Sequence, residues 1–164
     1  MPSFNFLDGS GPVLAHRHKN PDGSLGGWVA DTAFVEVGVH VGPDVMVYGQ
    51  AKVWDNAVLS GKTRVFGQAV ISGSAKISDE AWVIDQAIVT NQAELSGDIL
   101  VFGQARISGN AKISGDTRVG DNARVGEGVI LTTGVFLTGD VAKMTKIDQA
   151  VPVRMIAGTR LVGW

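Results

Sequence analysis

Residues 51–140 read AKVWDN AVLSGK TRVFGQ AVISGS AKISDE AWVIDQ AIVTNQ AELSGD ILVFGQ ARISGN AKISGD TRVGDN ARVGEG VILTTG VFLTGD when they are cut into blocks of six. All fifteen blocks have Val, Ile or Leu at the third position, and ten have Ala at the first. The fifth position is Gly, Asp or Asn in thirteen blocks. Three looser blocks, residues 33–50, precede these in the same register. Eighteen repeats therefore follow one another over residues 33–140 without an insertion.

Each block predicts a short strand followed by a turn. The first and third positions lie two residues apart, so they point to the same side of a strand, and the second position points to the other side. The fifth position suits a left-handed backbone, which Gly, Asn and Asp adopt most readily. A helix is excluded because a Gly every six residues would cost it about 1 kcal/mol each. The pattern therefore predicts a parallel β-solenoid with small apolar residues inside.

The aliphatic residue of each block is followed four positions later by a small one. Examples are Val53 to Ala57, Leu59 to Thr63 and Val65 to Ala69. In this respect the chain resembles the hexapeptide-repeat superfamily. The resemblance implies an all-β fold, a single-stranded left-handed parallel β-helix with three sides per coil. Eighteen blocks would then form about six coils.

The repeat also divides the chain. We expect an N-terminal hairpin or cap over residues 1–32, the β-helix over 33–142, and a C-terminal cap or tail over 143–164. Two turn signals, DGSG and NPDG, flank an apolar run in the first segment. Caps are expected because a solenoid has open strand edges at both ends. The GGWV motif at 26–29 and the closing RLVGW are similar to uncharacterised hexapeptide proteins of bacteria and phages.

Composition limits the classes of function. The 164 residues carry a formal net charge of −2 and contain no Cys and 22 Gly. This charge argues against general nucleic-acid binding, and the missing Cys excludes disulfides and Cys-ligated zinc. No apolar stretch reaches the roughly 18 residues of a membrane span. We therefore expect a cytoplasmic protein with no membrane partner.

Residues eighteen apart should stack in columns on the three outer faces. One face is much more apolar than the other two, which predicts that it is buried against another subunit. Members of the superfamily form trimers, so we expect a homotrimer. The predicted interface consists of Met46, Tyr48, Phe66, Trp82, Ile84, Leu100, Phe102 and Phe136.

The three histidines are the candidate catalytic residues. Acyltransferases of the superfamily use a His as general base, so His16, His18 or His40 would serve if the chain were such an enzyme. The repeat lacks the inserted loops of those enzymes, and we expect no catalysis. His16 and His18 could form half of a zinc site like that of the γ-class carbonic anhydrases. No third His follows at a suitable spacing, and neither a metal nor a cofactor is expected.

Four outward arginines are the candidate ligand-binding residues. They are Arg64, Arg106, Arg118 and Arg124. Arg is suited to bidentate capture of phosphate or carboxylate, so clefts between subunits could hold a small anion such as a nucleotide. Alternatively, these arginines pair with turn carboxylates such as Asp98, Asp116 and Asp121.

Three functions remain open at this point. We expect a homotrimeric scaffold or ligand-binding protein without catalytic activity. One alternative is an acyltransferase of the hexapeptide family. The other is a bacterial or phage protein that sequesters a small anionic ligand between its subunits.

Overall fold

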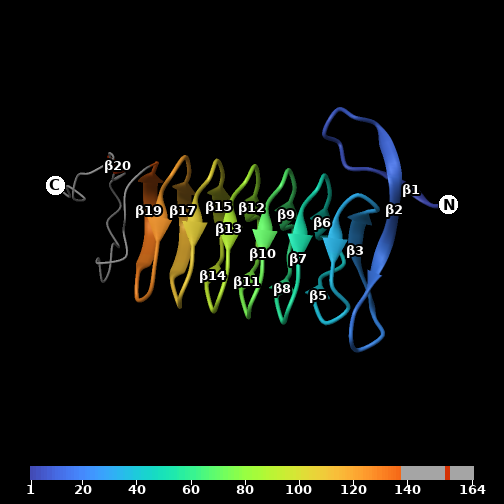
Figure 1. Ribbon diagram of the computed structural model, residues 1–164, viewed down its shortest axis with the longest axis horizontal. Helices are drawn as coiled ribbons and strands as arrows, with labels where there is room; N and C mark the ends of the chain where they lie inside the picture. Colours follow the sequence, from blue (N-terminus) through green and yellow to red (C-terminus); the bar gives the residue numbers. More distant parts are fainter. Residues whose placement is uncertain (138–153, 156–164) are drawn as a thin grey trace.

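The chain forms a parallel β-solenoid, as the repeat predicts (Figure 1). The computed structural model describes residues 1–137 and 154–155. Every regular element in this part is a strand, and most strands are two residues long. The same part contains no helix long and apolar enough to cross a membrane. The coils stack along one axis with an N-terminal group of strands across one end (Figure 1).

Three outer faces run along the solenoid. The arginine face consists of β4 (Phe34–Val35), β7 (Lys52–Val53), β10 (Val70–Ile71), β13 (Ile88–Val89), β16 (Arg106–Ile107) and β18 (Arg124–Val125). The aromatic face consists of β3 (Leu25–Ala30), β6 (Met46–Val47), β9 (Arg64–Val65), β12 (Trp82–Val83), β15 (Asp98–Val101) and the ends of β17 (Lys112–Val119) and β19 (Ile130–Phe136), with β20 (Arg154–Met155) beyond them. The polar face consists of β5 (His40–Val41), β8 (Val58–Leu59), β11 (Lys76–Ile77), β14 (Glu94–Leu95) and the beginnings of β17 and β19. The six strands of the arginine face correspond to six coils.

Parallel pairing joins each coil to the next in a register of eighteen residues. Val70, for example, pairs with Ile88, and its N–H donates to the carbonyl oxygen of Ala87 over 2.9 Å. Each coil thereby satisfies the polar backbone groups of its neighbour, as buried backbone requires.

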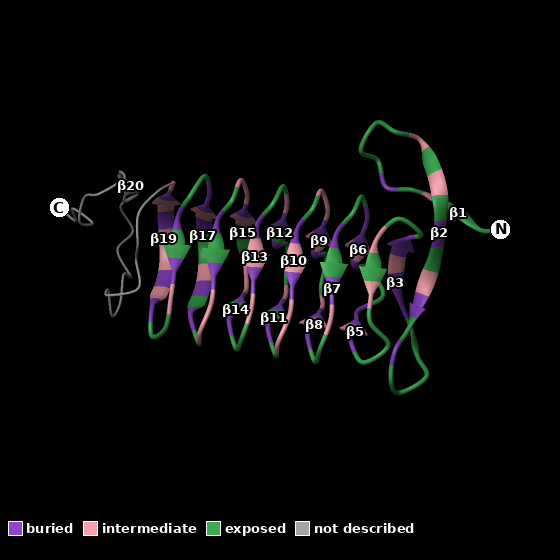
Figure 2. Cartoon of the chain, viewed as in Figure 1, coloured by how far each residue is buried: buried purple, intermediate pink, exposed green. Residues whose placement is uncertain are grey.

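The core is a narrow column of small and aliphatic side chains. Ala87 and Val89 are completely buried, whereas Ile88 between them is only partly buried. Figure 2 shows the same alternation along the successive strands. The prediction that the first and third positions of the blocks point inward is confirmed here.

The turns use the left-handed conformation that the fifth position predicts. All thirteen fifth positions from Gly49 to Asp121 have a positive φ. At Glu127 the pattern ends, and the following Gly128 has φ 78° instead. The turn therefore moves by one residue where a large side chain replaces the small one.

Aspartates at the fifth position of the blocks also connect successive turns. The carboxylate of Asp85 accepts a hydrogen bond of 2.9 Å from the backbone N–H of Gly103, eighteen residues later. Asp79 makes the same bond to the N–H of Gly97. Asp can thus replace Gly at some turns because its carboxylate satisfies a backbone donor of the next coil.

An antiparallel meander covers the first coil. It consists of β1 (Ser3–Asn5), β2 (Pro12–Lys19) and β3. Strand β3 also pairs in parallel with β6, where Trp28 lies beside Met46. The aromatic face therefore begins within the segment in which we expected only a cap. Gly27 stands at the inward position of this strand, where a Cβ would clash with the carbonyl oxygen of Val45.

Two side chains of the meander region cover the first strand edge of the polar face. The amide of Asn20 donates to the carbonyl oxygen of Val41 over 3.0 Å and accepts from its N–H over 2.8 Å. His18 Nε2 donates to the carbonyl oxygen of Val39 over 2.8 Å. These bonds replace the backbone partners that a preceding coil would provide, so the edge of β5 is blocked.

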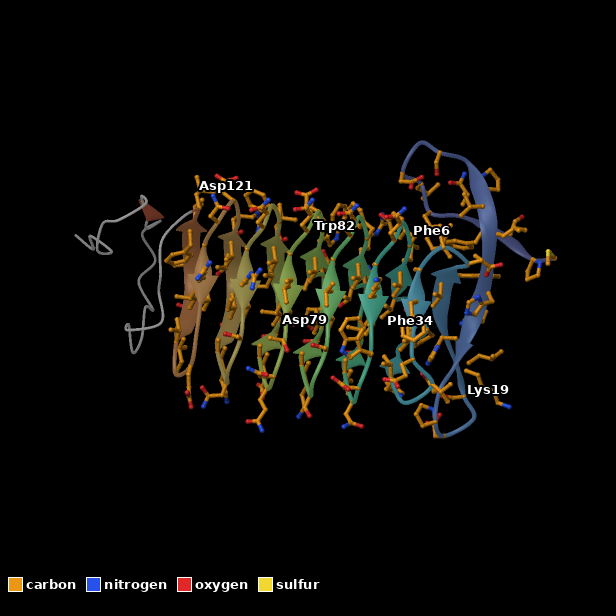
Figure 3. All side chains as sticks on the ribbon, viewed as in Figure 1. Phe6, Lys19, Phe34, Asp79, Trp82 and Asp121 are labelled. Carbon is orange, nitrogen blue, oxygen red and sulfur yellow. The ribbon has the colours of Figure 1, made fainter. Side chains whose placement is uncertain are left out.

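Aromatic rings from β1 and the residues after it cover one end of the aromatic face. Phe6 stacks on Tyr48 with a centroid distance of 4.7 Å, and Tyr48 stacks on Phe66 at 4.6 Å. Phe4 stacks on Trp28 at 4.8 Å. In Figure 3, Phe6 lies between the meander and the first coils. Tyr48, a predicted interface residue, is therefore already buried by the chain's own N-terminus.

The repeat register changes in the last described coil. Between Leu131 and Gly134 the turn is one residue shorter than the corresponding turn in β17, so Phe136 pairs with Val119. Phe136 is consequently 0% exposed and belongs to the core. The prediction that Phe136 points outward in an unbroken register is wrong, because the missing turn residue exchanges the two sides of the strand. Apart from Arg154 and Met155, the expected C-terminal cap at 143–164 lies outside the described residues.

Candidate functional site

The arginine face carries a shallow groove of about 460 Å³. Strands β10, β13, β16 and β18 direct their first residue outward into it, because their second residue points into the core. The lining residues are Gln68, Val70, Gln86, Ile88, Gln104, Arg106, Asn122 and Arg124. Two of the four predicted ligand-binding arginines thus lie together in one depression.

Arg106 and Arg124 are adjacent in the parallel register. Their strands lie about 4.8 Å apart, so two positively charged side chains leave neighbouring strands on the same face. Both residues are exposed, and within the described part of the chain neither side chain forms an ion pair or a hydrogen bond. An anion with two oxygen atoms would relieve the repulsion and accept hydrogen bonds from both guanidinium groups.

A ladder of amides forms one rim of the groove. Gln86 Nε2 donates to Gln68 Oε1 over 3.3 Å, and Gln104 Nε2 donates to Gln86 Oε1 over the same distance. Each amide carries two N–H groups and an oxygen with two lone pairs. Donors and acceptors therefore remain for a ligand after the ladder bonds have formed.

Hydroxyl groups lie on the other side of the outward strand residues, next to the groove. Ser72 and Thr90 lie one coil apart, and their hydroxyl oxygens are 2.9 Å from each other. A second hollow of about 350 Å³ lies between Thr90, Ser108 and the two arginines. The arginine pair is thus flanked by amides on one side and hydroxyls on the other.

Arg118 is already neutralised. Its guanidinium nitrogens lie 2.9 Å from a carboxylate oxygen of Asp116 and 3.5 Å from one of Asp98. It also donates to the carbonyl oxygen of Asp98 over 2.7 Å. The alternative expectation, that outward arginines pair with turn carboxylates, applies to this residue.

Arg64 lies apart from the groove, in a depression of about 470 Å³ between the aromatic face and the meander. Its guanidinium carbon is 5.1 Å from the ring centroid of Trp82. Arg17 lies similarly, 5.7 Å from the ring of Trp28. Cation–π contacts of this kind stabilise the charge without a carboxylate. The four arginines therefore do not form a single site.

The three histidines have different environments. His18 is buried, and desolvation lowers its pKa below the usual value although the bond to Val39 raises it partly. His16 is exposed, and its Nδ1 lies 2.9 Å from a carboxylate oxygen of Asp31. His40 is partly buried at the beginning of the polar face. None of the three lines the groove or the depression beside Trp28.

Among residues 1–137 and 154–155 no group of three His, Cys, Asp or Glu side chains is arranged to hold a metal ion. Of the two histidines considered for half of a zinc site, His18 uses its Nε2 for the hydrogen bond to the carbonyl oxygen of Val39, and His16 Nδ1 lies beside the Asp31 carboxylate.

The open part of the aromatic face lies beyond the N-terminal aromatic stack. Trp82 is 39% exposed, and it pairs in register with Leu100. Ile84 and Phe102 are partly buried at the corner, where the ring of Phe102 lies over Gly120. Met46 and Phe66 are partly buried beside the N-terminal aromatic cluster. The predicted interface is thus divided into a covered part and an open part.

Two features of the site escaped prediction from the sequence. The amide ladder follows from the sixth position of every third block, which reads Gln50, Gln68, Gln86, Gln104 and Asn122. This column was detectable at the eighteen-residue spacing. The contact of Phe4 and Phe6 with the aromatic face was not, because these residues lie outside the repeat.

Comparison with protein-family models, with curated proteins and with solved structures finds no match to this chain.

Proposed function

We propose that the chain is a non-catalytic binding protein of the hexapeptide-repeat superfamily that holds a small anionic ligand on its arginine face. The observation that carries the proposal is the adjacent pair Arg106 and Arg124, which lacks a partner within the described residues. Like charges on neighbouring strands repel each other, and an anion bound by both guanidinium groups would offset that repulsion. The left-handed coil that the family resemblance implies is part of the same proposal.

Titration calorimetry with pyrophosphate and with citrate tests the site. The double variant Arg106→Gln and Arg124→Gln should lose about tenfold or more in affinity, because each charge-assisted hydrogen bond contributes about 1.5–3 kcal/mol. The matched control, Lys19→Gln with Lys76→Gln, removes the same charge from exposed positions outside the groove and should bind as the parent does. Equal losses in both variants would mean that only net charge matters, and the site would be rejected.

We also propose that the chain assembles as a homotrimer through the open part of the aromatic face. Trp82, Ile84, Leu100 and Phe102 support this, since burying such side chains contributes about 1.5–3 kcal/mol each. Light scattering should give about 52 kDa, three times the chain mass of 17.2 kDa. Replacing Trp82 and Leu100 by Ser should shift the protein towards monomers. A monomeric parent at micromolar concentration would contradict the trimer.

Acyl transfer remains a second candidate because of one observation. The Asp31 carboxylate beside His16 Nδ1 is the arrangement that orients an imidazole as a general base. However, His16 lines neither of the two larger depressions described above. We expect no turnover of acetyl-CoA with a panel of amines and sugars. Turnover that His16→Ala abolishes would replace the binding function by catalysis.

A further inference from the structure

The polar rims of the arginine face extend beyond the arginine pair. Its outward strand residues, in register from one coil to the next, are Phe34, Lys52, Val70, Ile88, Arg106 and Arg124. Five strand spacings of about 4.8 Å make this row about 24 Å long. A small anion would occupy only the end with the arginines. A ligand that used the whole row would be an extended molecule.

The two ends of this row differ in chemistry. At the end nearest the meander, Phe34 is 52% exposed, and Trp54 lies partly exposed at the corner after Lys52. Figure 3 shows Phe34 close to the meander end of the solenoid. Glu36 also lies here, and its carboxylate accepts a hydrogen bond of 2.6 Å from the N–H of Asp55. This end therefore offers aromatic surface together with the opposite charges of Lys52 and Glu36, and it suits an uncharged ring better than the arginine end does.

Between the two ends the groove offers hydrogen bonds from both sides. The amides of Gln68 and Gln86 come two residues before the outward side chains Val70 and Ile88, and the hydroxyls of Ser72 and Thr90 come two residues after them, so the two polar columns flank an aliphatic strip. Amides and hydroxyls both donate and accept hydrogen bonds. A ligand rich in hydroxyl groups satisfies such rims, whereas an alkyl chain would leave them unpaired.

We propose that the arginine face binds an acidic oligosaccharide, a short chain of neutral sugars that carries a uronate carboxylate. The carboxylate lies against Arg106 and Arg124. The sugar hydroxyls bind the amide and hydroxyl rims, and a sugar ring packs its C–H face on Phe34. This inference rests on the proposed function, because it assigns the arginine pair as the anion site.

Single-stranded nucleic acid fits the groove less well. Such ligands require a cation for most phosphates and an aromatic side chain for most stacked bases. The row offers three cations, Lys52, Arg106 and Arg124, and the two aromatic residues lie together at one end. The formal net charge of −2 adds no attraction for a polyanion.

Titration calorimetry of the full chain with four probes tests the inference. The probes are glucuronate, xylotetraose, a xylotetraose that carries one glucuronate residue, and poly(U). We expect the acidic pentasaccharide to bind at least about tenfold more tightly than glucuronate or xylotetraose. In the double variant Arg106→Gln and Arg124→Gln, the pentasaccharide should bind no more tightly than xylotetraose. In the double variant Arg106→Lys and Arg124→Lys, part of the difference in affinity should be retained.

A second variant separates the oligosaccharide from a small anion. Phe34→Ser should weaken the pentasaccharide several-fold and leave glucuronate binding unchanged. Its matched control is Leu25→Ser, since Leu25 is an exposed apolar residue of the meander, 64% exposed. Far-ultraviolet circular dichroism and thermal melting should verify that each variant is folded.

The possible failures are distinguishable. If the pentasaccharide binds no more tightly than glucuronate, and glucuronate binding still depends on the arginine pair, the oligosaccharide is rejected and the anion site stands. If none of glucuronate, pyrophosphate, citrate and the pentasaccharide binds the parent, both proposals are rejected. Tighter binding of poly(U) than of the pentasaccharide, lost in the arginine variant, would assign the groove to nucleic acid instead.

Discussion

The aromatic face and the arginine face share one backbone and one core, but they differ in the contacts of their outward side chains. On the aromatic face, Phe6 covers Tyr48, Arg64 lies over Trp82, and Arg118 pairs with Asp116. On the arginine face, the two arginines have no partner among the described residues. The repeat therefore specifies the solenoid, while the outward positions can stabilise the chain on one side and remain free for a ligand on another.

Replacing an aromatic residue should have very different effects on the two faces. Phe6 is fully buried in the N-terminal aromatic stack, so Phe6→Ala should lower the free energy of unfolding by about 3–5 kcal/mol. Phe34→Ala, on the exposed surface of the arginine face, should change it by less than about 0.5 kcal/mol. Urea unfolding followed by circular dichroism measures both. Similar losses would mean that Phe34 also has a structural role, and the contrast between the faces would fail.

The strand register beneath the arginine face can be tested in one coil. Ala87 is completely buried in the core, so Ala87→Leu should destabilise the protein by about 1–3 kcal/mol through overpacking. Its neighbour Ile88 points into the groove, so Ile88→Ala should cost less. The unfolding midpoints of the two variants in urea give the comparison. Equal effects would indicate that the register is displaced by one residue, which would exchange core and groove.

The solenoid was predictable because short strands with a six-residue period bury their inward Ala and Val, Ile or Leu side chains when they stack as successive coils. The positive φ of thirteen successive turns follows from Gly, Asp and Asn at the fifth position. The outward position of Arg106 and Arg124 follows from the same register. Because residues that are eighteen apart lie on adjacent coils, the sequence alone predicts that these two arginines are neighbours.

Features that depend on contacts outside the repeat were not predictable. The N-terminal meander positions Phe6 on Tyr48 through long-range packing, which no periodicity encodes. Likewise, the shorter turn before Gly134 moves Phe136 into the core, although its block still fits the hexapeptide pattern. Patterning identifies which residues have the right chemistry, and the packing of the whole chain decides which of them find a partner.

The pH dependence of stability tests the polar face, because His18 covers the edge of its first strand, β5. Burial lowers the pKa of His18 below the unfolded value of 6.5, and the neighbouring imidazoles of His16 and His40 lower it further. The unfolded chain therefore binds the proton more readily than the folded one. Stability should be complete above about pH 6.5 and should fall as the pH drops towards the lower folded pKa.

Urea midpoints between pH 7.5 and pH 5 measure this dependence in the parent and in His18→Gln. An amide can still donate to the carbonyl oxygen of Val39, the residue just before β5, so the variant should fold and should have a shallower slope. Identical slopes would show that another group controls the acid response, and that the covered edge of β5 is not sensitive to His18.

The smallest expected effect compares two arginines directly. Arg118 has two carboxylate partners, but all three side chains are at least 32% exposed. Exposed ion pairs contribute about 0–1 kcal/mol, so Arg118→Gln should destabilise the protein only slightly. Arg106→Gln removes one of two adjacent, unpaired cations and should therefore be neutral or slightly stabilising at low salt. The difference should disappear near 1 M salt, where the screening length is about 3 Å. If Arg106→Gln destabilises the protein at low salt, Arg106 has a structural partner and the groove does not contain a free pair of cations.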